Sequence, residues 1–143
     1  MKISIETIIN APLDLVWRSW VTPEDITNWN FATNDWVCPE AQISLVVGGK
    51  FKYRMEAKDQ SMGFDFEGEF TSIVPLQSIN YRLEDNREVT CIFTEIDGKT
   101  KIVETFEIED ENSGEQQRQG WSMILENFKQ YVEKKATNKP SEG

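Results

Sequence analysis

The fold is decided by residues 114–135, GEQQRQGWSMILENFKQYVEKK. Apolar side chains recur there at steps of three and four residues, which places them on one stripe of an α-helix: Trp121, Ile124, Leu125, Phe128, Tyr131 and Val132. Polar residues fill the opposite face, so we expect the helix to lie on a core. Ahead of it, either Ser113 with Gln116 or Asn112 with Glu115 has the spacing of a capping box.

Most of the chain ahead of this helix has the period-two alternation of β-strands. Gly48-Gly49 predicts a hairpin turn, and Pro75 ends a strand. The seven predicted strands cover residues 2–9, 43–47, 51–57, 64–71, 79–83, 89–95 and 100–108. Short connections between them favour an antiparallel meander with one apolar face and one charged face.

Two short helices are predicted after the first strand. Pro12 suits the first turn of one, and Thr22 with Asp25 can cap a second that runs through Trp29. Residues 30–40 have no period and predict a loop that carries Phe31, Trp36 and Pro39. Its aromatic side chains either plug one end of the core or contact a ligand.

This order of elements predicts an α+β helix-grip fold. A curved seven-stranded antiparallel sheet should wrap around the long C-terminal helix, with the two short helices after the first strand closing one end. Residues 1–135 are expected to form a single domain, and residues 136–143, ATNKPSEG, a disordered tail.

Composition excludes several classes of function. The net charge of −10 argues against a nucleic-acid partner and against an anionic membrane surface. No apolar run is long enough for membrane insertion and no signal-peptide layout is present, so we expect a cytoplasmic protein. Cys38 and Cys91 are expected to be reduced and buried.

Histidine is absent from the chain. No Ser-His-Asp or Cys-His pair can therefore form, and imidazole cannot ligate a metal. We expect no metal, no cofactor and no conventional catalytic residue. Any catalysis would depend on carboxylates, tyrosines, lysines or bound water.

Three motifs in order resemble a known family. Residues 10–12, NAP, followed by VW at 16–17, resemble the opening of the START-like (SRPBCC) superfamily. The segment GGKF at 48–51, and QRQGW at 117–121 with the helix that follows, resemble its activator of heat-shock-protein ATPase homologue branch. The resemblance runs from about Ile3 to Val132, nearly the whole chain.

This resemblance implies a cavity between sheet and helix for hydrophobic small molecules such as lipids, polyketides or flavonoid-like compounds. Some members of the superfamily are cyclases or aromatases, and the heat-shock activators contact a chaperone in the stress response. Those activators also carry a separate N-terminal domain. Because this chain begins at its first strand, we expect that domain to be missing.

Inward positions of the strands and the helix stripe supply the candidate ligand-binding residues, with Trp36 at the mouth: Trp36, Tyr53, Met55, Phe66, Gly68, Tyr81, Glu104, Trp121, Leu125 and Phe128. The alternative for each is ordinary core packing. Gly68 within a strand and Gly120 within the helix either leave room for a ligand or allow close packing.

Glu104 shares its strand parity with Ile102 and Phe106. If that face points inward, a carboxyl group enters the cavity, where desolvation would raise its pKa. It would then need a partner such as Tyr53, Tyr81 or Arg54. The alternative is a twisted or edge strand that leaves Glu104 in solvent.

Three hypotheses follow. The first is a module that binds an apolar small molecule. The second is a cyclase-like enzyme that uses Glu104 and a tyrosine, against which the missing histidine weighs. The third is a protein-interaction role like that of the heat-shock activators, against which the missing domain weighs. We expect a monomer or a weak homodimer.

Overall fold

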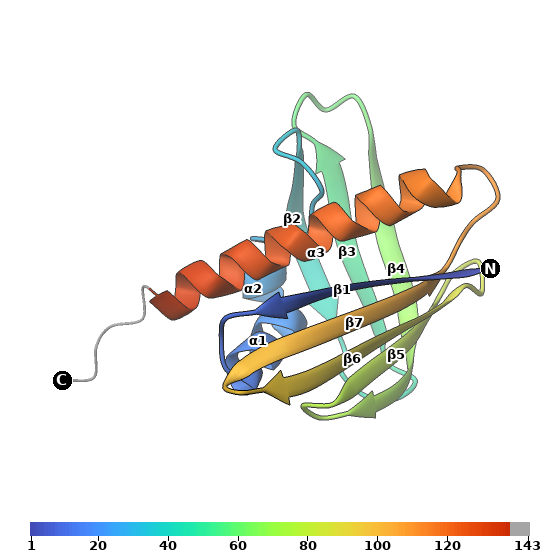
Figure 1. Ribbon diagram of the computed structural model, residues 1–143. Coiled ribbons are helices and arrows are strands. Elements are labelled where there is room, and N and C mark those ends of the chain that lie inside the picture. The colour runs from blue at the N-terminus through green and yellow to red at the C-terminus, as the bar shows by residue number, and fades with distance from the viewer. Residues whose placement is uncertain (138–143) are drawn as a thin grey trace.

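The computed structural model describes residues 1–137 (Figure 1). Its elements, in chain order, are β1 (Lys2–Ile9), α1 (Leu13–Val21), α2 (Pro23–Ile26), β2 (Trp36–Ile43), β3 (Lys50–Ala57), β4 (Gly63–Val74), β5 (Ser78–Leu83), β6 (Glu88–Ile96), β7 (Lys99–Glu107) and α3 (Gly114–Thr137). They confirm the predicted α+β helix-grip fold with its seven strands, two short helices and one long helix.

The sheet is antiparallel throughout, in the order β1-β7-β6-β5-β4-β3-β2. Strands β2 to β7 are neighbours in sequence order, as a meander requires, and β1 pairs with β7 at the far edge. The sheet curves strongly and α3 lies across it, with α1 and α2 at one end (Figure 1). The apolar faces of sheet and helix are thereby covered together.

The start of α3 is held by the predicted capping box of Ser113 and Gln116. The amide of Gln116 donates to Oγ of Ser113 at 3.1 Å, and the amide of Ser113 donates to Oε1 of Gln116 at 3.3 Å. The alternative cap at Asn112 is wrong, because Asn112 bonds Glu109 instead. The helix continues through Thr137, so the predicted tail begins too early; its remainder, residues 138–143, lies outside the described residues.

The predicted loop at residues 30–40 is wrong from Trp36 onward, because β2 already begins there. The β2–β3 register shifts between Val37 and Glu40, and this irregularity removes the alternation that identifies a strand. The strand predicted at residues 43–47 is also misplaced, since β2 ends at Ile43 and the residues after it form the turn.

The second short helix is shorter than predicted. It ends at Ile26, not at Trp29, and Thr22 makes no side-chain capping bond. Asp25 instead accepts hydrogen bonds from the Tyr131 hydroxyl and from Nζ of Lys135, the latter at 2.7 Å. The short helix is therefore tied to the end of α3, which holds α3 over the sheet.

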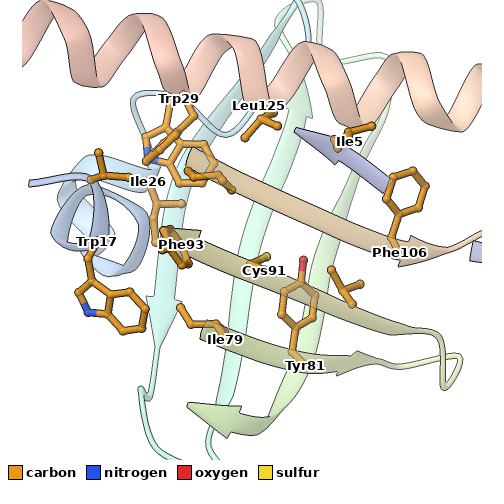
Figure 2. Packing of buried hydrophobic residues seen from close by; sticks show 14 of the residues in the cluster. Ile5, Trp17, Ile26, Trp29, Ile79, Tyr81, Cys91, Phe93, Phe106 and Leu125 are labelled. Carbon is orange, nitrogen blue, oxygen red and sulfur yellow. The ribbon is translucent and has the colours of Figure 1, made fainter. Parts of the chain in front are cut away.

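Aromatic packing fills the end of the molecule where α1 and α2 lie. The ring of Phe128 on α3 lies 4.8 Å from Trp20 and 4.7 Å from Trp29, and Nε1 of Trp29 donates to the Ser19 carbonyl at 3.0 Å. Figure 2 shows Trp29 and Ile26 between α3 and the sheet, near Phe93 of β6. This end of the molecule is core.

Candidate ligand-binding cavity

The sheet and the N-terminal half of α3 enclose a cavity of about 360 Å³. Binding pockets for small molecules start at about this size. The sheet side is formed by Ile43, Phe51, Tyr53, Met55, Phe64, Phe66, Phe70, Ile79, Tyr81 and Glu104, and the helix side by Gln117, Gly120, Trp121, Ile124 and Leu125. The two ends are closed by Trp20, Val21, Trp29, Asn30 and Ala32, and by Arg87, Glu109 and Asn112.

Aromatic rings make up much of the wall. The Phe51 ring centroid lies 4.9 Å from both Tyr53 and Tyr81, at the centre of a cluster on β3, β4 and β5. Across the cavity, Trp121 stacks on Phe106 at 4.3 Å and meets the edge of Phe66 at 6.1 Å. Such a wall favours planar or apolar ligands.

Glu104 lies inward on β7, as its parity predicts, and only 5% of it is exposed. Its strand is internal, paired with Ile5 of β1 on one side and Cys91 of β6 on the other. The Cys91 thiol donates to Oε2 of Glu104 at 3.7 Å. Burial raises the pKa of Glu104 to about 8, against the smaller opposing effect of that hydrogen bond.

The prediction that Arg54 could be a partner of Glu104 is wrong. Its guanidinium group bonds Glu56 at 3.0 Å and Asp65 at 3.5 Å among exposed side chains. Strand parity explains the difference, since Arg54 alternates with the inward residues Tyr53 and Met55 on β3.

Two phenol groups share the cavity with Glu104. Tyr53 of β3 and Tyr81 of β5 both line it. Figure 2 shows the hydroxyl of Tyr81 beside Cys91, pointing from β5 into the interior. Desolvation, and then the charges of Cys91 and Glu104, raises the pKa of Tyr81 well above its usual value, so the phenol stays neutral.

Gln117 fixes the end of the cavity that lies near the start of α3. Its Oε1 accepts from the Glu109 amide at 2.8 Å, and its Nε2 donates to the Asn112 carbonyl at 2.9 Å. These bonds hold the segment before the helix against the cavity. The sequence did carry a signal for Gln117, which lies one helical turn before Trp121 on the same stripe.

The structure brings seven of the ten predicted site residues to the cavity wall: Tyr53, Met55, Phe66, Tyr81, Glu104, Trp121 and Leu125. The prediction missed Phe51, Trp20, Trp29, Asn30 and Gln117 among others. Phe51 has the same parity as Tyr53 and Met55, so the pattern could have identified it. Asn30 follows no pattern.

Trp36, Gly68 and Phe128 do not line the cavity. Trp36 lies just outside the cavity, and its ring centroid is 5.9 Å from that of Phe64, which does line it. Phe64 is 49% exposed, so the cavity reaches the surface there. A Cβ atom on Gly68 would lie 2.7 Å from Cζ of Phe51, so this glycine makes room for a core ring.

The described part of the chain, residues 1–137, holds no group of three or more Cys, Asp or Glu side chains that could bind a metal ion. None of its helices combines the length and apolar character needed to cross a membrane.

The fold and the cavity define a helix-grip protein of the START-like (SRPBCC) superfamily, with the space between sheet and long helix as its candidate site. The family model for Activator of Hsp90 ATPase homolog 1-like protein matches residues 10–133. The chain therefore belongs to the Activator of Hsp90 ATPase homolog 1-like family.

Solved structures agree with this assignment. The AHSA1-like protein from Aeromonas hydrophila is 40% identical, with a TM-score of 0.92 over 100% of this chain and 99% of that chain. Chr148 from Cytophaga hutchinsonii is 37% identical, with a TM-score of 0.81 over 99% of both chains. CV1439 from Chromobacterium violaceum, at 22% identity and a TM-score of 0.81 over 93% of this chain and 98% of that chain, shares the fold. A comparison with curated proteins found no match.

Proposed function

We propose that this protein binds an apolar small molecule in the cavity between the sheet and α3. The observation that carries the proposal is the cavity itself, about 360 Å³ within a wall that is largely aromatic and aliphatic. A wall of this kind gains free energy when an apolar ligand replaces water. Membership of a family that commonly binds hydrophobic ligands supports the same function.

Gly120 offers a direct test because it lines the cavity without a side chain. No heavy atom lies within 4 Å of the position a Cβ would take there. Gly120→Phe should therefore fill ligand space without displacing the backbone. Met123→Phe is the matched control, since Met123 lies on the exposed side of the same helix.

The measurement is tryptophan fluorescence during titration with 2-(naphthalen-2-yl)ethanol, because Trp20, Trp29 and Trp121 all border the cavity. We expect saturable quenching in the wild type and in Met123→Phe, and about a tenfold or greater loss of affinity in Gly120→Phe. Native mass spectrometry of the purified protein should also detect co-purified apolar compounds. Equal affinity in all three proteins would place binding outside the cavity.

Acid–base catalysis is a second candidate function, which Glu104 favours. A carboxyl group with a pKa of about 8 can either donate or accept a proton near neutral pH. If a co-purified compound changes mass during incubation with wild-type protein but not with Glu104→Gln, the protein is an enzyme. Unchanged mass in both leaves binding as its function.

A further inference from the structure

The inner cavity contains an acid with no basic partner. Arg87 is the only basic residue on the wall within the described chain, and its Nε lies 2.6 Å from Oδ2 of Asp85. Among residues 1–137, the side-chain donor that bonds Glu104 is the weak thiol of Cys91, at 3.7 Å. A buried carboxylate normally has a counter-charge or strong donors, so the ionised form of Glu104 would need a cation supplied by a ligand.

Residues with oxygen acceptors line the cavity from three strands. The Glu104 carboxyl comes from β7, the Tyr81 hydroxyl from β5 and the Tyr53 hydroxyl from β3. The Tyr53 and Tyr81 rings both lie 4.9 Å from the Phe51 ring, and Glu104 lines the same cavity. A primary ammonium group has three N–H donors and no acceptor, so it can bond oxygens of this kind.

Aromatic faces supply the second requirement for binding a cation. The rings of Phe51, Tyr53, Phe66 and Tyr81 pack together on the sheet, and Trp121 of α3 meets the edge of Phe66. The negative face of each ring attracts a cation, most strongly where water is excluded. The net charge of −10 also attracts cations to the molecule from a distance.

We propose, building on the binding function above, that the ligand is an apolar molecule with a primary amine, whose ammonium group pairs with Glu104 while its apolar body lies against Phe66 and Trp121. The amine pairs with the ionised carboxylate, so the carboxyl proton passes to the solvent on binding. A ligand with a carbonyl or hydroxyl group would instead keep the protonated acid and release nothing.

The surroundings of Glu104 allow this proton release to be measured. Cys91 of β6, Tyr81 of β5 and Tyr53 of β3 share the interior with it, and the pKa of each is raised; Arg87 and Glu109 close one end of the same cavity. From β1 the neighbour is Ile5, and α3 contributes Trp121 and Leu125, which do not titrate. Glu104 is therefore the group that loses its proton near pH 8.

The test compares two probes of similar shape, 2-(naphthalen-2-yl)ethylamine and 2-(naphthalen-2-yl)ethanol, by isothermal titration calorimetry on the full chain. We expect the amine to bind about tenfold more tightly than the alcohol at about pH 8. Its affinity should rise from about pH 6.5 to that pH as Glu104 ionises. Heats in buffers of different ionisation enthalpy should show proton release for the amine only.

Two variants separate the carboxylate of Glu104 from general charge. Glu104→Gln should lower amine affinity about tenfold or more and leave alcohol affinity within about threefold. Glu95→Gln removes an exposed carboxylate that does not line the cavity and should leave both affinities nearly unchanged. Binding of the alcohol by Glu104→Gln would also show that this variant is folded.

The outcomes are distinct. Alcohol binding equal to or tighter than amine binding, amine binding without proton release, or unchanged amine affinity in Glu104→Gln would each overturn the amine proposal and leave the cavity function standing. The proton-release measurement needs no variant, so it decides the matter even if Glu104→Gln does not fold. Failure of both probes to bind would overturn the binding function as well.

Discussion

At the scale of single residues, Glu104 couples folding to pH. Its carboxyl group titrates at about 4.5 in an unfolded chain, whereas burial raises its pKa to about 8 in the folded protein. Between these values the folded state holds a proton that the unfolded state has released. The stabilising contribution is therefore complete below the lower pKa and is lost as pH rises through the higher one.

We predict that the free energy of unfolding falls across this window because of Glu104, by up to about 5 kcal/mol if the whole pKa difference is realised. Urea unfolding of wild type and Glu104→Gln at several pH values between 4.5 and 8 measures it. The difference in the free energy of unfolding between the two proteins separates the contribution of Glu104 from those of the other carboxylates. A difference that does not change with pH would show that Glu104 is not desolvated.

Two glycines of the cavity region should respond in opposite directions to alanine. At Gly68 a Cβ atom would lie 2.7 Å from the Phe51 ring and 2.8 Å from the Arg82 carbonyl, so Gly68→Ala should destabilise by about 1–3 kcal/mol. At Gly120 the space is open, and Gly120→Ala should stabilise the helix by about 0.5–1 kcal/mol. Urea melts of both variants check this. The same sign for both would contradict the packing described.

At the scale of elements, α3 has two functions along one stripe. Its N-terminal half, with Trp121 and Leu125, faces the cavity. Its C-terminal half packs on α1 and α2: Phe128 is fully buried, and Nδ2 of Asn127 donates to the Trp29 carbonyl at 3.0 Å. The second half therefore anchors the helix, which leaves the first half free to line a cavity.

Alanine substitutions along the stripe should separate these functions. Phe128→Ala should cost about 3–5 kcal/mol, because it empties a filled site between Trp20 and Trp29. Trp121→Ala should cost less, about 2–3 kcal/mol, because its ring borders empty space and stacks only on Phe106. The Trp121→Ala variant should also lose more affinity for an apolar ligand than alanine variants at other positions of the stripe. Chemical unfolding and fluorescence titration measure the two effects.

At the scale of the whole molecule, the cavity is a part of the interior that side chains leave unfilled. Protein interiors are normally packed as densely as organic crystals, so wall atoms beside a cavity lack contacts. A ligand that fills the space restores those contacts only in the folded state. Ligand binding should therefore raise the free energy of unfolding of this protein.

A ligand at about 100 times its dissociation constant should stabilise the wild type by about 2.7 kcal/mol. Thermal unfolding should shift upward with ligand concentration, as measured by circular dichroism with 2-(naphthalen-2-yl)ethanol. Gly120→Phe, with about tenfold or more lower affinity, should gain at most about 1.4 kcal/mol at the same ligand concentration and show a correspondingly smaller shift. An equal shift in that variant would mean that the ligand stabilises the protein from another site.

Local periodicity in the sequence determined the elements and the direction of their side chains. The parity of Ile102, Glu104 and Phe106 predicted an inward carboxyl group, and three- and four-residue steps predicted the stripe of α3. Both patterns depend only on near neighbours in the chain. Periodicity failed at Trp36, where the register shift in β2 breaks the alternation and hides a strand.

The tertiary structure alone decided what each inward side chain meets. Trp121 and Phe128 share a stripe, yet one borders the cavity and the other packs between Trp20 and Trp29. Glu104 meets Cys91 because strand pairing places β6 beside β7 with these two residues opposite each other. Periodicity sets the direction of a side chain, but sheet curvature and the opposing layer set the distance to its neighbours, and that distance separates a cavity from a core.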